Sequence, residues 1–225
     1  MKSFFPSTTI PLLMAVTWLT SSLRAEDVLL DPMDYADVTI FKESWGAMEA
    51  RGDFAEIRTS DPETPHAPYL FLRNSLIQRN LDRALQKEDW TLKFKVLHSA
   101  PMRGVWVGLF NDSGSEGYAV LWDSGNSGEG SNGSVSIRKF DAAEPLAEWS
   151  QTGVAIAPAV KGVHSIMEPP FAELELSWKQ ESGLLTVVMD GIELQSVATP
   201  SLDQVSQVIV RGNWQSLDDI QVSTP

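Results

Sequence analysis

The chain has 225 residues, with 30 acidic and 17 basic side chains, three histidines and no cysteine. The lack of cysteine excludes disulfides, thiolate zinc sites and cysteine nucleophiles. The formal net charge of −13 argues against binding to nucleic acid, because such binding needs basic side chains to neutralise phosphates. A chain of this length can bury a full core without disulfides.

The first 25 residues differ in character from the rest. Lys2 gives a short positive start, residues 10–19 are mostly apolar, and the small residue Ala25 ends the segment. The apolar run is too short to span a bilayer, so the pattern is typical of a secretory signal peptide. We therefore expect a secreted or periplasmic protein with one domain over residues 26–225 and no membrane insertion after cleavage.

The first half of the mature chain contains several short strand patterns. Residues 52–60 and 69–74 read as strands separated by a loop with three prolines, and residues 75–81 as a strand beside the second of these. Residues 81–89 have the clearest helical propensity, and we expect a turn or helical connection there.

Three further strands are expected between residues 90 and 122. Residues 90–97 alternate. Trp90, Leu92, Phe94 and Val96 are expected to face a core, and Thr91, Lys93 and Lys95 to face water. Residues 104–110 and 117–122 are apolar on both faces, which indicates either central strands with two covered faces or strands that present aromatics to a ligand. A glycine- and serine-rich loop follows over residues 123–134.

The last quarter gives the strongest signal. Four apolar-alternating runs follow one another between residues 171 and 222, and Asp190-Gly191 divides the second run into the arms of a hairpin. Period-two alternation with an Asp-Gly turn is typical of antiparallel sheet. The sequence therefore predicts an all-β protein built as a two-sheet antiparallel sandwich.

Several segments together resemble the concanavalin A-like lectin and glucanase superfamily of jelly-roll sandwiches, which includes laminin-G-like modules. The segments are WTLKFKV (residues 90–96), GLFNDSGSEGYAVLW (108–122), LELSWKQESGLLTVVMDGIEL (174–194) and LDDIQV (217–222). The resemblance implies a concanavalin A-like fold over residues 26–225, with a last strand that returns beside the N-terminal one. That fold hosts lectins, hydrolases and adhesion modules, so the resemblance leaves the function open.

Glu173 and Glu175 are the candidate catalytic residues. Glucanases of this superfamily carry alternating acids, Glu-x-Asp-x-Glu, on one strand face, where one acid attacks and another protonates the leaving oxygen. Here the nearest match has Glu175 in place of the aspartate and Ser177 in place of the third acid. The same two acids also suit the solvated face of an amphipathic strand, and we favour that interpretation.

Two acidic segments suggest calcium without fixing a site. Asn111-Asp112-Ser113 with Glu116, and the loop from Asp123 to Glu129, offer hard oxygen ligands, although turn chemistry explains the same residues. Asp218 and Asp219 point to opposite faces of a strand unless a bulge intervenes, so we expect them to protect a sheet edge.

A group of aromatics gives the best candidate for ligand binding. Trp106 and Phe110 share one strand face, and Tyr118 and Trp122 share another, so paired strands would join them into one platform for sugar rings. The alternative is that these side chains fill the core. The polar residues expected to orient a bound sugar are Asn111, Asp112, Asp123 and Arg138.

These patterns favour a non-catalytic carbohydrate-binding (lectin-like) or adhesion module whose partner is a polysaccharide or other glycan, without an organic cofactor. Two alternatives stay open. One is a glycoside hydrolase or related sugar-processing hydrolase, and the other is a structural envelope protein that binds other proteins.

Overall fold

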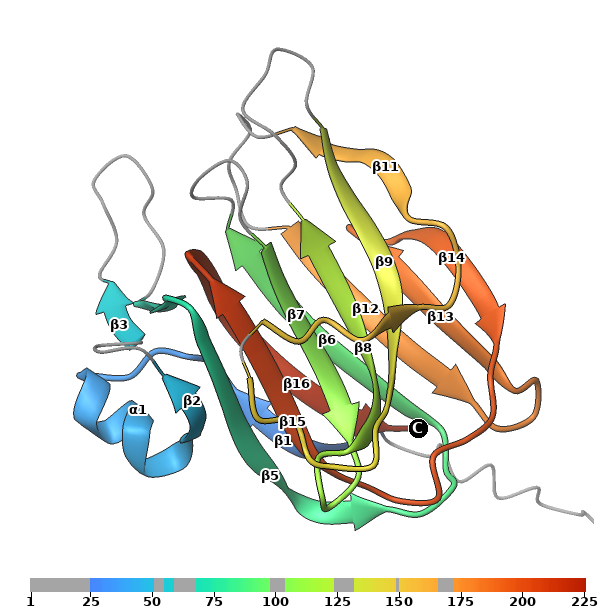
Figure 1. The fold of residues 1–225 in the computed structure, drawn as a ribbon, viewed down its shortest axis with the longest axis horizontal. Helices are drawn as coiled ribbons and strands as arrows, with labels where there is room; N and C mark the ends of the chain where they lie inside the picture. The colour runs from blue at the N-terminus through green and yellow to red at the C-terminus, as the bar shows by residue number, and fades with distance from the viewer. Residues whose placement is uncertain are drawn as a thin grey trace, which may run out of the picture.

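Two antiparallel sheets stacked face to face make up the protein (Figure 1). The structure is a computed structural model, and it describes residues 25–50, 55–58, 68–97, 104–123, 132–148, 150–165 and 172–225. In order across the first sheet lie β14 (Ile192–Ala198), β13 (Leu184–Met189), β12 (Ala172–Lys179), β6 (Trp90–Leu97), β16 (Gln215–Thr224), β4 (Tyr69–Leu72) and β3 (Ala55–Arg58), with β1 (Glu26–Asp31) also paired to β16. The predicted all-β sandwich is confirmed.

The second sheet is built in the same way. Its strands, in order, are β10 (Val154–Ala155), β9 (Asn132–Asp141), β8 (Glu116–Asp123), β7 (Gly104–Phe110), β15 (Val205–Asn213), β5 (Ser75–Leu85) and β2 (Gly46–Ala50), with β11 (Val160–Ser165) also paired to β9. The single α-helix of the described residues, α1 (Val38–Ser44), lies beside β2 and β3 at one side of the sandwich (Figure 1). No helix in this part of the chain is long and apolar enough to cross a bilayer.

The alternating runs of the sequence form strands as expected. The four runs after residue 171 become β12, the β13–β14 hairpin, β15 and β16, and both turn residues, Asp190 and Gly191, have the positive φ that a tight hairpin requires. In β6, Leu92, Phe94 and Val96 are buried between the sheets, whereas the lysines that alternate with them are half-buried on the outer face. Burial of the apolar set on one face fixes the register of each strand.

Two expectations about residues 69–89 are wrong. The strand from Ser75 is not the neighbour of Tyr69–Leu72, because the chain crosses from the first sheet to the second at Arg73 and Asn74. The helical connection expected at residues 81–89 is largely strand, since β5 continues to Leu85 and pairs with β15. Leu81 and Leu85 are buried there, and this tertiary pairing outweighs a weak helical propensity.

A β-bulge in β16 separates Asp218 from Asp219. Asp218 pairs with Lys95 and Gln221 with Lys93, so β16 carries one more residue than β6 between these pairs, and Asp219 has φ 48°. Asp219 forms an ion pair with Lys95, whereas Asp218 is only 8 % exposed. The expected role of the two acids at a sheet edge is wrong, because β6 flanks β16 on one side and β4 and β1 on the other.

A buried carboxylate ties α1 to the sandwich. Asp31, at the end of β1, is 2 % exposed and accepts hydrogen bonds from Tyr35 Oη at 2.5 Å and Trp45 Nε1 at 2.8 Å, on either side of the helix. The guanidinium of Arg79 in β5 forms an ion pair with the same carboxylate. Burial, followed by the bond to Asp31, raises the pKa of Tyr35 to about 12. This network joins both sheets and the helix.

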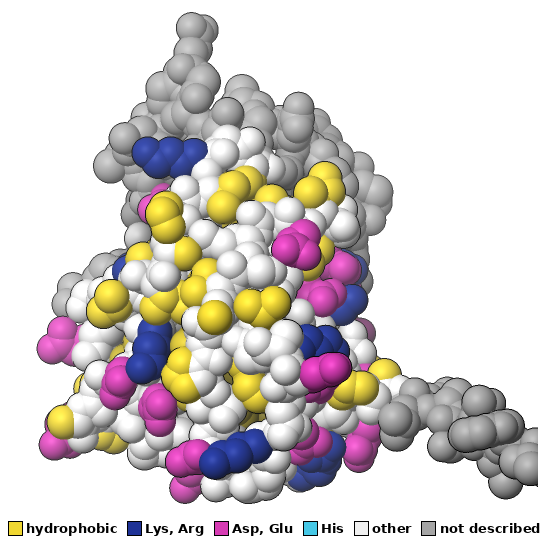
Figure 2. Space-filling view, turned by 90° about the vertical axis from the view of Figure 1, so that its right-hand side faces the viewer, with side chains coloured by type: hydrophobic (Ala, Val, Ile, Leu, Met, Phe, Trp, Pro, Cys, Tyr) yellow, Lys and Arg dark blue, Asp and Glu magenta, His cyan; other side chains and the backbone are white. Residues whose placement is uncertain are grey.

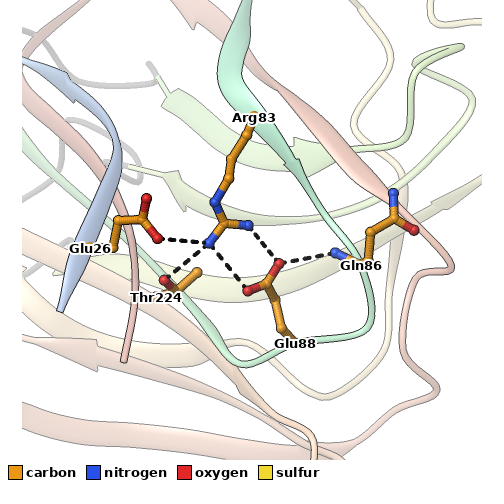
Figure 3. A network of polar contacts seen from close by, with 5 residues as sticks. All are labelled: Glu26, Arg83, Gln86, Glu88 and Thr224. Carbon is orange, nitrogen blue, oxygen red and sulfur yellow. Dashed lines mark hydrogen bonds and ion pairs between the residues drawn. The ribbon is translucent and has the colours of Figure 1, made fainter. Parts of the chain in front are cut away.

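A second network links the first strand of the described sandwich to the last one (Figure 3). Arg83 of β5 donates to Glu88 at 2.8 and 3.3 Å, to Glu26 at 3.2 Å and to Thr224 at 3.4 Å. Glu26 and Thr224 are also register partners in the β1–β16 pair. The beginning of the first strand and the end of the last strand of the described sandwich therefore lie side by side.

The side of the sandwich away from α1 is formed by the open edges of both sheets. Figure 2 views this side, where hydrophobic side chains form a band and charged side chains lie mostly lower down. Val154 of β10 is 71 % exposed, and Ile192 at the start of β14 is 67 % exposed. Gln195 of β14 donates to the carbonyl of Pro158 at 3.0 Å, so the two sheets are also linked at this side.

Close packing in β7 and β8 makes Gly117 hard to replace. A Cβ atom built there would lie 2.4 Å from Phe110 Cδ1 and 2.6 Å from the carbonyl oxygen of Leu109. We expect Gly117→Ala to lower the free energy of unfolding by about 2 kcal/mol, because the ring and the backbone must both move. Gly46→Ala is the matched control, since its Cβ would have no heavy atom closer than 3.7 Å. Urea titration of both variants checks the prediction, and equal midpoints would contradict it.

Candidate functional site

The four aromatics expected to form one platform do not come together. β7 and β8 do pair, but Trp106 lies opposite Leu121 and Trp122 opposite Val105, which places the two aromatic pairs on opposite faces of the second sheet. Tyr118 and Trp122 belong to the core between the sheets, and Trp106 and Phe110 belong to a second apolar cluster. All four are at most 1 % exposed. They pack as core side chains, and the expected single platform is not formed.

The second cluster lies on the outer face of the second sheet and is closed by the chain between β9 and β10. Leu146 of this connection packs in the cluster, and Trp106 Nε1 donates to the carbonyl of Gln151 at 3.0 Å. The rings of Trp106 and Phe140 lie 4.8 Å apart beneath it. No strand pattern in the sequence indicates this covering segment. Because the segment covers the outer face of the sheet, β7 and β8 present no aromatic side chain to solvent although they are apolar on both faces.

Arg138 binds the same connection between β9 and β10. Its Nε donates to the carbonyl of Thr152 and its Nη2 to the carbonyl of Gly153, both at 2.8 Å. Burial lowers the pKa of this guanidinium. Arg138 therefore holds the β9–β10 connection on the sheet. Asp123, the last residue of β8, is exposed, and the loop after it, residues 124–131, lies outside the described residues.

Asn111 and Asp112 lie in the turn between β7 and β8. They line a groove of about 370 Å³ together with Ser113, Glu116, Asp203 and Gln204. The Oδ1 atom of Asn111 accepts hydrogen bonds from the Ser115 and Glu116 backbone N–H groups at 3.1 and 3.3 Å, so this oxygen stabilises the turn. No three His, Cys, Asp or Glu side chains of the described residues are grouped so as to hold a metal ion. The turn thus gives the calcium hypothesis no support.

Glu173 and Glu175 lie on the outer face of the first sheet. Glu175 forms an ion pair with Lys93 at 3.0 Å, and Glu173 is the register partner of Lys95. A shallow groove of about 260 Å³ beside them is lined by Leu30, Lys93, Phe94, Lys95, Glu173, Asp219 and Gln221. Cross-strand pairs of opposite charge are typical of a solvated sheet face.

The β15–β16 hairpin carries an exposed aromatic that the sequence analysis missed. Trp214 is the residue between the two strands, has φ 58° and is 38 % exposed. A bulky residue in this backbone region is uncommon, and such conformations gather at functional sites. Its ring meets the ring of Phe71 edge-on at 6.1 Å. The hairpin thereby places an indole at the end of the sandwich, next to β4.

Two arginines surround these rings. The Cζ atom of Arg58 lies 3.5 Å from the centre of the Phe71 ring, and that of Arg73 lies 5.4 Å from the centre of the Trp214 ring. Glu56 accepts from Arg58 at 3.4 Å and from Arg73 at 3.0 Å. Guanidinium groups stack well on aromatic faces and keep their N–H donors in the plane of the group. We call these five residues, with the groove described next, the Trp214 site.

A groove of about 500 Å³ continues from Arg73 toward the helix. Its lining comes from the start of α1, from β3 and from the chain before β4, namely Tyr35, Ala36, Asp37, Val38, Ala55, Glu56, Ile57, Pro68 and Arg73. Asp37 caps α1 by accepting from the Ile40 N–H at 3.2 Å and the Thr39 N–H at 2.7 Å, and these bonds lower the pKa of its carboxyl. The groove is thus partly apolar, with one guanidinium and two carboxylates at its walls.

One signal in the sequence pointed to this site. Gly212-Asn213-Trp214 interrupts the alternation between two strong strand runs, and a tryptophan in a turn has no core face to occupy. Arg58 and Arg73 lie on either side of the proline-rich loop, far from Trp214 in sequence. Only the pairing of β4 with both β3 and β16 brings the three together.

No protein-family model matches the chain, and no curated protein does. Solved structures do match it. The carbohydrate recognition domain of Emp46p in its potassium-bound form gives a TM-score of 0.54 at 12 % identity over 88 % of this chain and 94 % of that one. The legume lectin-like domain from Entamoeba histolytica gives 0.55 at 10 % identity, over 88 % and 96 %.

An enzyme matches equally well. β-Agarase A in complex with oligoagarose gives a TM-score of 0.57, and β-agarase A from Zobellia galactanivorans gives 0.55, each at 12 % identity over 89 % of this chain and 92 % of that one. Likeness at this level of identity establishes the fold and no finer property. The chain has the concanavalin A-like lectin and glucanase fold.

Proposed function

We propose that the chain is an exported, non-catalytic carbohydrate-binding protein and that glycan binds at the Trp214 site. The observation that carries the proposal is an exposed indole flanked by a guanidinium and next to a groove of about 500 Å³. An indole offers an apolar surface to the C–H face of a sugar ring, and nearby charged groups hydrogen-bond its hydroxyls. The fold is shared with carbohydrate recognition domains, which supports the proposal.

The positions of the side chains assign each of them a role in glycan binding. Trp214 contacts the face of one sugar, and Arg73, which lies between the indole and the groove, donates hydrogen bonds to it. Glu56 holds Arg73 at 3.0 Å and thereby orients those donors. A neighbouring sugar of the same chain then extends into the groove toward Tyr35, which precedes α1.

The hydrolase alternative has less support. Its candidates Glu173 and Glu175 lie on a face of the first sheet where lysines pair with acids, and Glu175 is itself in an ion pair. Release of reducing sugar that Glu175→Gln abolishes would favour the hydrolase. A structural envelope role, and export itself, rest on residues and partners outside the described sandwich.

Trp214→Ala is expected to weaken glycan binding about 30-fold or more, because a central aromatic at a binding surface contributes about 2 kcal/mol or more. Alanine keeps the β-carbon, so the positive φ of the hairpin is strained to a similar degree in both proteins. The measurement is binding of residues 26–225 to a broad glycan array, followed by titration calorimetry with the selected glycan.

Ile192→Ala is the matched control, since it removes an exposed apolar side chain at the opposite side of the sandwich and should leave binding unchanged. A well-folded protein that binds no glycan on the array would refute the proposal. Binding that survives Trp214→Ala but is lost in Asp112→Ala would move the site to the groove at Asn111 and Asp112.

A further inference from the structure

β14 forms an open edge of the first sheet. It pairs with β13 on one side, and no strand of the described residues pairs with its other side. Such an edge presents unpaired backbone N–H and C=O groups, which proteins usually protect with charges, proline or a β-bulge. A bulge lies between Glu193 and Gln195, but residues 195–198 beyond it (QSVA) contain neither a charge nor a proline. That part of the edge is therefore open to another strand.

An exposed apolar surface adjoins the open edge. Residues 154–163, which lead from β10 into β11, read VAIAPAVKGV, and residues 192–198 of β14 read IELQSVA. None of these 17 residues is buried, and only one lysine and one glutamate among them are charged. Gln195 Nε2 donates to the carbonyl of Pro158 at 3.0 Å, so the two segments are in contact. We call them the β14 edge surface, which lies on the side with the hydrophobic band in Figure 2.

The chemistry of the β14 edge surface indicates what binds there. It has no aromatic side chain on which a sugar ring could stack, and its single lysine gives little attraction to anionic lipid. Exposed apolar surfaces of this kind mark contacts between proteins. The chain has a net charge of −13, so two copies repel each other over most of their surface. At the β14 edge surface they can meet without bringing many like charges together.

The geometry of this surface also suits a second copy. A twofold axis perpendicular to the sheets sets β14 antiparallel to β14 of the partner copy, so that the first sheets of both copies join into one. The same rotation brings residues 154–163 of the two copies next to each other, because this axis keeps each sheet in its own layer. The 17 residues approach the about 20 to 30 that each side of a stable interface contributes.

We propose that the β14 edge surface is the interface of a symmetric dimer of this chain. Residues 195–198 of the two copies pair as antiparallel strands, and the side chains of residues 154–163 pack between the copies. Val154, now 71 % exposed, is buried by this contact. The dimer does not depend on glycan binding, because Trp214 lies between β15 and β16, away from β14.

Sedimentation velocity of residues 26–225, from about 1 to about 200 μM, measures the mass of the protein as a function of concentration. We expect the monomer to convert to a dimer and to no larger species, because a twofold axis closes after two copies. Amide hydrogen exchange followed by NMR locates the contact. Amides within residues 195–198 should exchange at least about tenfold more slowly where the dimer predominates.

Two variants test the surface, and a third controls for the added charge. Val154→Glu and Ala198→Glu each place a carboxylate where the dimer would bury it without a partner, so each should weaken the dimer at least about tenfold. Leu30→Glu is the matched control, because Leu30 is a 61 % exposed apolar residue on β1, and it should leave the dimer unchanged. All three side chains are exposed, and circular dichroism checks that each variant keeps the fold.

Each other outcome would overturn the dimer at this surface. A monomer at every concentration would do so, and binding of that monomer to phosphatidylcholine vesicles, lost in Val154→Glu, would assign the surface to a membrane instead. A dimer that survives both Val154→Glu and Ala198→Glu would place the interface elsewhere. A dimer without slower exchange at residues 195–198 would contradict the strand pairing, and equal weakening by Leu30→Glu would reduce the effect to general repulsion.

Discussion

Asp31→Asn is expected to lower the free energy of unfolding by about 3 kcal/mol, because removing one partner from a buried ion pair leaves the other uncompensated. The amide keeps an oxygen for the Met33 N–H, which donates at 3.0 Å to Oδ1. Its NH₂ group, however, replaces the oxygen to which Trp45 and Arg79 donate. Both donors then face another donor, and the anchor of α1 is lost.

Urea unfolding followed by tryptophan fluorescence measures this loss. Asp27→Asn is the matched control, because Asp27 lies on the same strand, is exposed, and accepts from Gln221 at 2.6 Å. That variant should differ from wild type by less than about 0.5 kcal/mol, as exposed polar contacts usually do. A loss below about 1 kcal/mol in Asp31→Asn would mean that the network contributes little to stability.

Stability should fall as the pH rises from about 4 to about 7, and Asp218 should account for much of the fall. Burial, and then the nearby charge of Asp219, raise the pKa of the Asp218 carboxyl to about 7. Its Oδ1 atom is buried without a partner. The unfolded chain releases this proton near pH 4, whereas the folded protein keeps it, so each pH unit between these values costs the fold at most about 1.4 kcal/mol.

Asp218→Asn removes the ionisable group, so the variant should lose this pH dependence. Above pH 7 it should be more stable than wild type, by at most about 4 kcal/mol, and below pH 4 the two should be alike. Thermal unfolding across pH 3.5–8 gives the comparison. Asp219→Asn removes a negative charge beside Asp218, so stability should stop falling at a lower pH in this variant than in wild type. A constant difference between Asp218→Asn and wild type at all pH values would contradict the assignment.

The strands that could be predicted from the sequence are those with one buried face, because apolar residues then recur at every second position. β6 and the strands from β12 to β16 have that pattern, and the Asp190-Gly191 turn fixes one hairpin between them. The end of β5 lacks the pattern, because residues 81–85 take their strand conformation from pairing with β15 rather than from local preference. The crossing between sheets at Arg73 and Asn74 likewise follows from tertiary packing.

The candidate site was harder to predict than the fold. Aromatic residues in strands were the natural candidates, but Trp106 is covered by a connection with no strand pattern, and Trp122 fills the core. Nothing local to β7 or β8 indicates that cover. Trp214 lies in a turn, where aromatic residues attract less attention, and its neighbours Phe71 and Arg73 approach it only through the β4–β16 pair.

The adjacency of Glu26 and Thr224 determines how the Trp214 site is displayed. Both residues lie at one end of β16, and the hairpin with Trp214 lies at the other end, about 30 Å away for a strand of ten residues. In a protein of residues 26–225, an affinity tag, a solid support or a fused protein attached at either end would therefore lie about one strand length from Trp214. For the same reason, a short linker could join Glu26 to Pro225 in that protein, and new ends could be opened elsewhere without moving the hairpin.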